Sequence, residues 1–272
     1  MKKLFAVLFT VITVLCAATV AVSADAAPTP SIDVTVSIIN RTPQMAAEKV
    51  TVTDADGDGT ISVSDALYCA HEKKFNGGAE AGYATEMTQW GISPTKLWGV
   101  SNGGSYGYYV NNVSPMSLAD EIKTGDNVCA FVYTDTVTFS DKYSYFDKIT
   151  ATVDAGGTLE LTLSYADYDE NWTPIVKLAE NATITVDGKD TAFKTDKDGK
   201  VTITLTEAGT HVISAVTTSE NLVSPVLVVT VNPPESGFKP ANLGWLIPVC
   251  AAVVIGAVAV AIYLSKKNSE KK

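Results

Sequence analysis

The sequence is short of positive charge. Its 272 residues hold 20 Lys and Arg against 30 Asp and Glu, which gives an isoelectric point near 4.7. A nucleic-acid-binding surface needs Lys and Arg to replace the counterions of the phosphate backbone. This composition therefore argues against nucleic acid as a partner. With 46% hydrophobic and 18% charged residues, the chain also lacks the composition of a disordered protein, and its length suffices for one or two domains with cores.

Cysteine and histidine are scarce as well, with four Cys and two His. Two of the cysteines fall in long apolar runs near the chain ends, which leaves Cys69 and Cys129. These two could form a disulfide or remain buried thiols, and both alternatives stay open. His71 lies two residues from Cys69 on a predicted helix, where the two side chains do not face each other. We find no Cys–His dyad and no nucleophile–base pair, so we expect no enzyme.

The hydrophobic excess, seen in a mean hydropathy of +0.14, is concentrated at the two ends. At the N-terminus, Lys2 and Lys3 precede an uncharged run over residues 4–22, which is followed by the small residues Ser23 and Ala24. This order of charge, apolar stretch and small residues is typical of a signal peptide, which we predict over residues 1–24. A retained signal anchor is the alternative, because the run is long enough to approach a membrane span.

A second run without charge covers the 22 residues 243–264. At about 1.5 Å per residue it can cross a hydrocarbon core of about 30 Å. Four lysines follow in residues 265–272, and positive residues stay on the cytoplasmic side. We therefore predict a single-pass protein of the cell membrane with residues 25–242 outside the cell. That part keeps 14 basic and 29 acidic residues, a net charge of −15, which suits divalent cations better than anionic lipid.

The predicted extracellular part divides into a linker (25–31), a first module (32–147), a second module (148–232) and a Pro-containing stalk (233–242). In the second module, polar and apolar residues alternate in short segments separated by turn signals, which predicts an Ig-like antiparallel β-sandwich. The expected strands are 149–153, 159–163, 182–186, 191–195, 201–205, 211–216 and 226–231. The expected fold class is therefore mostly β: an α+β module, then an Ig-like sandwich, then one transmembrane helix.

Residues 54–65 fit the twelve-residue calcium loop of an EF-hand. Carboxylates occupy positions 1, 3, 5 and 12, and a glycine occupies position 6, where the chain must turn sharply. Four carboxylates this close repel one another unless a divalent cation neutralises them, and oxygen ligands favour Ca²⁺ over zinc. An acidic turn between a strand and a helix is the alternative. The predicted ligands are Asp54, Asp56, Asp58, the carbonyl of Thr60, Ser62 through water, and Asp65.

The loop is dockerin-like, because position 12 is Asp65 and not Glu. The shorter side chain predicts modest affinity, which is sufficient outside a cell. The helix that the loop opens is predicted to run to about Phe75. Dockerins carry two such loops, and we find one, since residues 196–199 lead directly into an alternating strand and are better interpreted as a hairpin turn. A cohesin partner is therefore not expected.

The chain beyond the helix is rich in aromatic residues and glycine. Asn102-Gly103, a strong hairpin signal, separates Lys96-Leu97-Trp98-Gly99-Val100 from Ser105-Tyr106-Gly107-Tyr108-Tyr109-Val110-Asn111, and Gly125-Asp126-Asn127-Val128 then leads into an aromatic strand. With these motifs, residues 32–147 resemble the C-terminal domain of transcobalamin and intrinsic factor, which recurs in bacterial surface proteins, some with a calcium loop before the helix. The resemblance implies a β-grasp-like α+β module.

Two interpretations of the aromatic run stay open. Tyr and Trp favour strands and commonly line a core. Alternatively, they form a stacking platform for a planar ligand or a sugar. The candidates for such a platform are Trp98, Tyr106, Tyr108, Tyr109 and Asn111.

Two functions are compatible with these features. The first is a calcium-stabilised, membrane-anchored surface protein that presents a non-enzymatic binding or adhesion module to a protein or glycan partner. The second, which the resemblance implies, is surface capture of a small ligand such as a corrinoid, although the helical domain that completes vitamin carriers is missing here. We favour the first.

Overall fold

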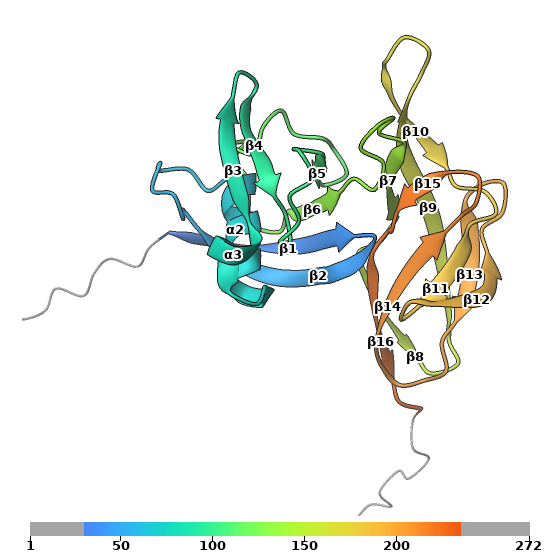
Figure 1. Ribbon diagram of the computed structural model, residues 1–272. Helices are drawn as coiled ribbons and strands as arrows, with labels where there is room; N and C mark the ends of the chain where they lie inside the picture. Colours follow the sequence, from blue (N-terminus) through green and yellow to red (C-terminus); the bar gives the residue numbers. More distant parts are fainter. Residues whose placement is uncertain (1–29, 235–272) are drawn as a thin grey trace, which may run out of the picture. The chain divides into compact units, whose positions relative to one another are not determined.

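The structure is a computed structural model that describes residues 30–234 (Figure 1). The predicted signal peptide, residues 1–24, and the predicted span, residues 243–264, lie outside this range. Within residues 30–234, no helix is long and apolar enough to cross a membrane. The described chain forms two compact units, one made of residues 30–36 and 48–130 and the other of residues 37–47 and 131–234.

The first unit contains most of a four-stranded sheet, two helices and a separate hairpin. Its sheet has the order β2-β1-β6-β5, and β3 pairs with β4 alone. The elements are β1 (Ser31–Asn40), β2 (Thr42–Thr53), α2 (Val63–Lys74), α3 (Gly78–Gly82), β3 (Ala84–Thr88), β4 (Gly91–Lys96), β5 (Tyr106–Val110) and β6 (Asn127–Val132). One end of each of β1, β2 and β6 is assigned to the second unit.

Local sequence explains most of this unit. The alternation of apolar residues along β1 buries Val34, Val36 and Ile38, and β6 is buried along almost its whole length. The helix predicted after the acidic loop is confirmed as α2, which ends with Phe75 as its C-cap.

The hairpin predicted around Asn102-Gly103 does not form. β4 pairs with β3, and β5 pairs with β6, so the segments on either side of Asn102-Gly103 belong to different sheets. The connecting residues close on themselves instead. Leu97 and Val100 exchange backbone hydrogen bonds of 3.0 and 2.9 Å, and the Asn102 side chain bonds both backbone groups of Ser105. Two tight local turns therefore replace one hairpin turn.

The second unit is a β-sandwich of two five-stranded sheets. One sheet has the order β10-β9-β7-β15 with β13 also paired to β9, and the other has the order β12-β11-β14-β16-β8. The elements are β7 (Asp141–Phe146), β8 (Thr150–Asp154), β9 (Thr158–Tyr168), β10 (Pro174–Leu178), β11 (Thr183–Val186), β12 (Lys189–Lys194), β13 (Lys200–Thr204), β14 (Gly209–Val216), β15 (Asn221–Val223) and β16 (Leu227–Asn232).

One apolar cluster fills the space between these two sheets. Leu161 and Leu163 of β9 face Ile184 of β11 and Ile213 of β14, and all four side chains are almost fully buried. Their positions follow the period of two that the sequence pattern predicts for half-buried strands. The mostly β fold and the sandwich are confirmed, and each of the seven predicted strands has a counterpart.

The sandwich starts earlier than the predicted boundary at residue 148. β7 pairs with β9 through Ser144–Tyr165 and Phe146–Leu163, so it belongs to the sandwich. β10 and β15 were also missed. β10 begins with Pro174 at a sheet edge, and β15 has three residues, so neither gives a clear alternating pattern. The predicted turn at residues 196–199 forms, with Gly199 donating to the Asp196 carbonyl, but the strands it joins lie in different sheets.

Candidate metal centre

The acidic loop between β2 and α2 gathers three carboxylates. Oxygens of Asp54, Asp56 and Asp58 all lie within 4.8 Å of one another, and the three side chains are half-buried or exposed. These are positions 1, 3 and 5 of the predicted calcium loop. Hard oxygen ligands at this spacing are the kind that Ca²⁺ takes.

Backbone N–H groups hold the loop in this shape. The Asp54 carboxylate accepts hydrogen bonds from the N–H groups of Gly57 (2.7 Å), Asp58 (3.1 Å) and Gly59 (2.8 Å). Both glycines have positive φ, 77° and 94°, a region that other residues seldom adopt. Gly59 is the residue that the sequence pattern placed at the sharp turn. The loop is therefore curved around the first of the three carboxylates.

The charges in this loop are not balanced by cationic side chains of the loop. The N–H group of Gly59, followed by those of Gly57 and Asp58, lowers the pKa of Asp54. Burial raises the pKa of Asp56, and the negative charges of Asp65 and Asp58 add to that rise. A divalent cation beside Asp56 would offset the repulsion from these neighbours.

Asp65 and Ser62 make the contacts of a helix N-cap. Asp65 accepts hydrogen bonds from the N–H groups of Ala55 (2.8 Å) and Ser62 (2.8 Å) and from the Ser62 hydroxyl (2.7 Å). Ser62 is the N-cap of α2, and the pair forms a capping box. The Asp65 side chain is 2% exposed and lies outside the group of three carboxylates. The N–H group of Thr60 donates to Asp58 at 2.8 Å.

The structure therefore brings together three of the six predicted ligands and ties two others to the start of the helix. Asp65 links Ala55, near the start of the loop, to the first turn of α2. An ion at the three carboxylates would sit in a loop whose two ends are already joined. The roles predicted for Thr60, Ser62 and Asp65 as ligands stay predictions.

A second cluster, which the sequence did not reveal, surrounds His71 on α2. Its ring is fully buried, with Nδ1 2.7 Å from the Leu67 carbonyl and Nε2 accepting the N–H of Trp98 at 3.0 Å. These two bonds require the neutral tautomer with the proton on Nδ1. Burial lowers the pKa of His71. The rings of Phe75, Tyr83 and Trp98 lie 5.2–6.0 Å from the imidazole. No spacing rule connects residues 71 and 98, so sequence reasoning could not pair them.

The residues of the candidate aromatic platform have different surroundings in the structure. Trp98 packs beside His71, whereas Tyr106 is 8% exposed and its hydroxyl bonds the carbonyls of Thr95 (2.8 Å) and Val100 (2.9 Å). Tyr108 and Tyr109 are half-buried on β5. The Asn111 amide donates to Asp126 at 2.8 Å and its oxygen accepts the N–H of Asn127 at 2.9 Å. The contacts of Tyr106 and Asn111 are structural, and a ligand role for the set stays a prediction.

Cys69 and Cys129 are both thiols in this structure, one half-buried on α2 and the other buried on β6. A bonded state, the other alternative that the sequence left open, would need the two backbones to meet disulfide geometry.

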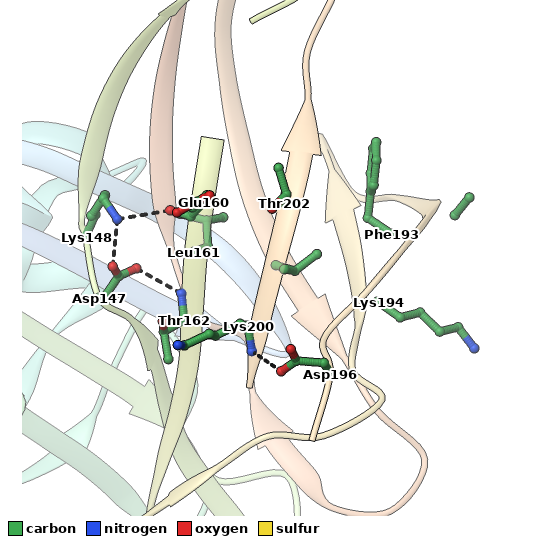
Figure 2. Close-up of a pocket in the computed structure, with 12 residues that line it drawn as sticks. Asp147, Lys148, Glu160, Leu161, Thr162, Phe193, Lys194, Asp196, Lys200 and Thr202 are labelled. Atoms are coloured by element: carbon green, nitrogen blue, oxygen red, sulfur yellow. Dashed lines mark hydrogen bonds and ion pairs between the residues drawn. The ribbon is translucent and has the colours of Figure 1, made fainter. Parts of the chain in front are cut away.

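The sandwich contains a groove of about 730 Å³ (Figure 2). Lys148 bonds Asp147 at 2.6 Å and the Glu160 carbonyl at 3.0 Å along one side. The opposite side carries Phe193 and Lys194 of β12. The groove is open and lined by charges of both signs.

Comparisons with known proteins identify no family for this chain. No family model and no curated protein matches the chain. Among solved structures, "Crystal structure of Dscam1 isoform 9.44, N-terminal four Ig domains" is similar at 13% identity with a TM-score of 0.20. The similarity covers 55% of this chain, and the chain spans 32% of that one.

Proposed function

We propose that this chain is an exported, membrane-anchored surface protein whose first unit binds Ca²⁺ at residues 54–65 and whose extracellular part serves as a non-enzymatic binding module for a protein or glycan partner. One observation carries the calcium proposal: the oxygens of Asp54, Asp56 and Asp58 lie within 4.8 Å of one another in a loop that backbone N–H groups have already curved. The loop spacing in the sequence supports it independently.

Electrostatics add a second argument. Burial and acidic neighbours raise the pKa of Asp56. Repulsion among the three carboxylates therefore lowers the stability of the folded turn. A bound divalent cation removes this repulsion. Because the ion would bind the folded loop and not the unfolded chain, it stabilises the first unit by mass action.

The anchoring part of the proposal is supported by the sequence alone: the charge-flanked run over residues 1–24, the uncharged run 243–264 and the four lysines after it. The proposal of a binding module and not an enzyme comes from the sequence. In the structure, the ring nitrogens of His71 contact the Leu67 carbonyl and the Trp98 N–H, and those of His211 contact Asp187 and the Glu207 carbonyl. An Ig-like role for the sandwich belongs to the same proposal.

The test is the thermal stability of the full chain in neutral detergent, measured with millimolar Ca²⁺ and with chelator. Ca²⁺ at ten times its dissociation constant should add about 1.4 kcal/mol to the free energy of unfolding of the first unit. Mg²⁺, which demands a tighter octahedral shell, should add less. Hydrogen exchange resolved by peptide should place the added protection in residues 48–75.

Matched variants decide whether the loop is responsible. The double change Asp54→Asn and Asp58→Asn should abolish the calcium-dependent rise. Asp198→Asn, at an exposed turn of the second unit, should leave it unchanged. An equal Tm with Ca²⁺ and with chelator, or a rise that survives the double change, would refute the site.

A further inference from the structure

Two loops of the second unit display exposed aromatic side chains. The first loop, residues 133–140, joins β6 to β7, and the second, residues 169–173, joins β9 to β10 (Figure 1). Phe139 is 54% exposed, Tyr168 at the end of β9 is 53% exposed, and Trp172 is 82% exposed. We refer to these loops with Tyr168 as the aromatic loops.

The aromatic loops lie at the same end of one sheet. β7 and β9 are antiparallel, and the pairing of Ser144 with Tyr165 runs toward the start of β7 and the end of β9. An ion pair between Lys142 and Asp167 continues the same register one step further. The loop before β7 and the loop after β9 therefore emerge side by side.

Each of the two loops holds a pair of aromatic rings in contact. The ring centroids of Tyr133 and Phe139 are 5.6 Å apart, and those of Tyr168 and Trp172 are 6.2 Å apart. Burial raises the pKa of Tyr133, and the charges of Asp141 and Tyr168 add to that rise. Because the antiparallel pairing of β7 with β9 brings the two loops to the same end of the sheet, the two pairs of rings lie at that end.

Two of these aromatic residues have a backbone conformation that their side chains disfavour. Phe139 has a φ of 53° and Trp172 a φ of 61°. In this left-handed region glycine and asparagine are the usual residues, and a bulky residue there is an outlier. The Trp172 N–H donates to the Asp169 carbonyl at 3.0 Å, in a tight turn where glycine would be natural. The turn does not need the indole, which points instead to a use for it outside the fold.

The same loops are held by aspartates. Asp135 accepts hydrogen bonds from the N–H groups of Val137 and Thr138, both at 3.0 Å, and from the Ser140 hydroxyl at 2.7 Å. Asp169 accepts from the N–H groups of two residues of its own turn at 2.8 Å. The exposed rings are therefore presented by ordered loops, which lowers the entropy cost of binding.

Charge identifies the kind of partner. The aromatic loops contain Asp135, Asp169 and Glu170 and no Lys or Arg, and residues 131–234 hold 15 Asp and Glu against 7 Lys. Hydrogen bonds from Thr138 hold the pKa of Asp135 well below its usual range, and N–H groups of the turn lower the pKa of Asp169. Both carboxylates are ionised at neutral pH. This rim repels anionic lipid, anionic glycan and nucleic acid, and it attracts a cation.

Ring orientation is compatible with a bound cation. The planes of Tyr133 and Phe139 meet at 83°, and those of Tyr168 and Trp172 at 49°, so the ring faces point in several directions. A cation is attracted by the face of an aromatic ring, and several such faces at one site add to that attraction. We propose that the aromatic loops are a docking site for arginine side chains of a basic segment in a partner protein. Arg suits the site better than Lys, because its planar guanidinium stacks on aromatic faces and bonds carboxylates.

This site is independent of the calcium loop, which lies in the other unit. The test uses the full chain in neutral detergent and a fluorescein-labelled nonapeptide of alternating Arg and Gly, with binding read from fluorescence anisotropy. Peptides in which Arg is replaced by Lys or by Glu, a neutral oligosaccharide and choline serve as competitors. We expect the Arg peptide to bind more tightly than the Lys peptide. The Glu peptide and the oligosaccharide should not compete with it.

Variants identify the residues. Trp172→Asn and Phe139→Asn keep a residue that tolerates positive φ, so the loops remain folded, and each should weaken binding of the Arg peptide about fivefold or more. Trp90→Asn is the matched control, because Trp90 is 80% exposed in the first unit, and it should leave binding unchanged. Glu170→Gln should weaken binding about twofold at low salt and have no effect at high salt.

Three results would overturn the proposal. Equal losses in Trp90→Asn and Trp172→Asn would show that the contact is a general property of exposed tryptophans. Binding of the oligosaccharide or the Glu peptide as tightly as the Arg peptide would exclude a cation-selective site. Choline binding more tightly than the Arg peptide would assign the site to a quaternary ammonium headgroup and not to a protein.

Discussion

Trp98 in the first unit and Trp172 in the second share an unusual backbone conformation, with φ of 48° and 61°, but their side chains have opposite surroundings. Trp98 donates its N–H to His71 and its ring lies 5.2 Å from that of Phe75. Trp172 is 82% exposed and contacts Tyr168. In the first unit, interior contacts offset the strain of a left-handed tryptophan. In the second unit the fold offers no such compensation, so the strained residue points to an external role.

The largest expected effect comes from Trp98. Trp98→Asn relieves the backbone strain but removes the indole from beside His71 and Phe75, and loss of a packed aromatic side chain costs about 3 kcal/mol. We expect the first unit to lose at least about 2 kcal/mol of stability, measured by urea unfolding of the full chain with peptide-resolved hydrogen exchange.

A Trp98→Asn variant as stable as the parent would contradict the contrast between the two tryptophans. The relief of backbone strain would then be at least as large as the lost packing of the indole, in the first unit as in the second. Gly103→Ala is a control for the loop itself. A Cβ there meets nothing within 4 Å, so its cost should be only that of a positive φ, about 1 kcal/mol.

Aspartates extend the comparison, because both units use a carboxylate to hold a loop. Asp65 is 2% exposed and joins Ala55 and Ser62, whereas Asp135 holds an exposed loop. Asp65→Ala leaves buried N–H groups without acceptors and removes half of a capping box, so we expect a loss of about 2–4 kcal/mol. Asp135→Ala should cost much less than Asp65→Ala, because water can replace the lost acceptor. Equal losses in the two variants would remove the distinction between buried and exposed loop anchors.

How far the sequence predicts this molecule depends on whether a feature is local. Alternation predicted the sandwich strands, because a strand between a core and solvent repeats every two residues. Loop spacing predicted that Asp54, Asp56 and Asp58 would meet. The capping contacts of Asp65 were not predicted, because the carboxylate at that position was already accounted for as a ligand of the loop.

Features that depend on distant contacts escaped prediction. His71 and Trp98 meet across 27 positions, which no periodicity encodes. β7 lies in the segment that the resemblance assigned to the first module, yet it pairs with β9, about twenty residues later. The positive φ of Phe139 and Trp172 was invisible for a different reason: propensity argues against these residues in that region, so the conformation is known only from the structure.

The two histidines should give the units opposite pH responses. Burial lowers the pKa of His71 below 6.5, so its contribution to stability is present above 6.5 and is lost as the pH falls from there. The hydrogen bond to Asp187, followed by that to the Glu207 carbonyl, raises the pKa of His211, so its contribution is full below 6.5 and is lost as the pH rises through the raised value.

One group can change the slope by at most about 1.4 kcal/mol per pH unit, and the exposed pair of the second unit should give much less. Peptide-resolved hydrogen exchange between pH 5 and 8, at corrected intrinsic rates, measures both slopes in one sample. His211→Gln should flatten the slope of the second unit alone. A first unit that gains stability on acidification to pH 5.5 would contradict the neutral tautomer assigned to His71.

The smallest expected effect is also the sharpest test of the contrast between Trp98 and Trp172. Trp172→Asn replaces a strained, exposed indole with a residue that tolerates positive φ, and the second unit should keep its stability or gain up to about 1 kcal/mol. Trp90→Asn, which changes an equally exposed indole, should give no such gain. A loss of more than about 1 kcal/mol in Trp172→Asn would mean that the indole contributes to folding and that its exposure needs no partner. A gain combined with weaker binding of the arginine peptide would show that the second unit retains strain at this turn because the indole is used for recognition.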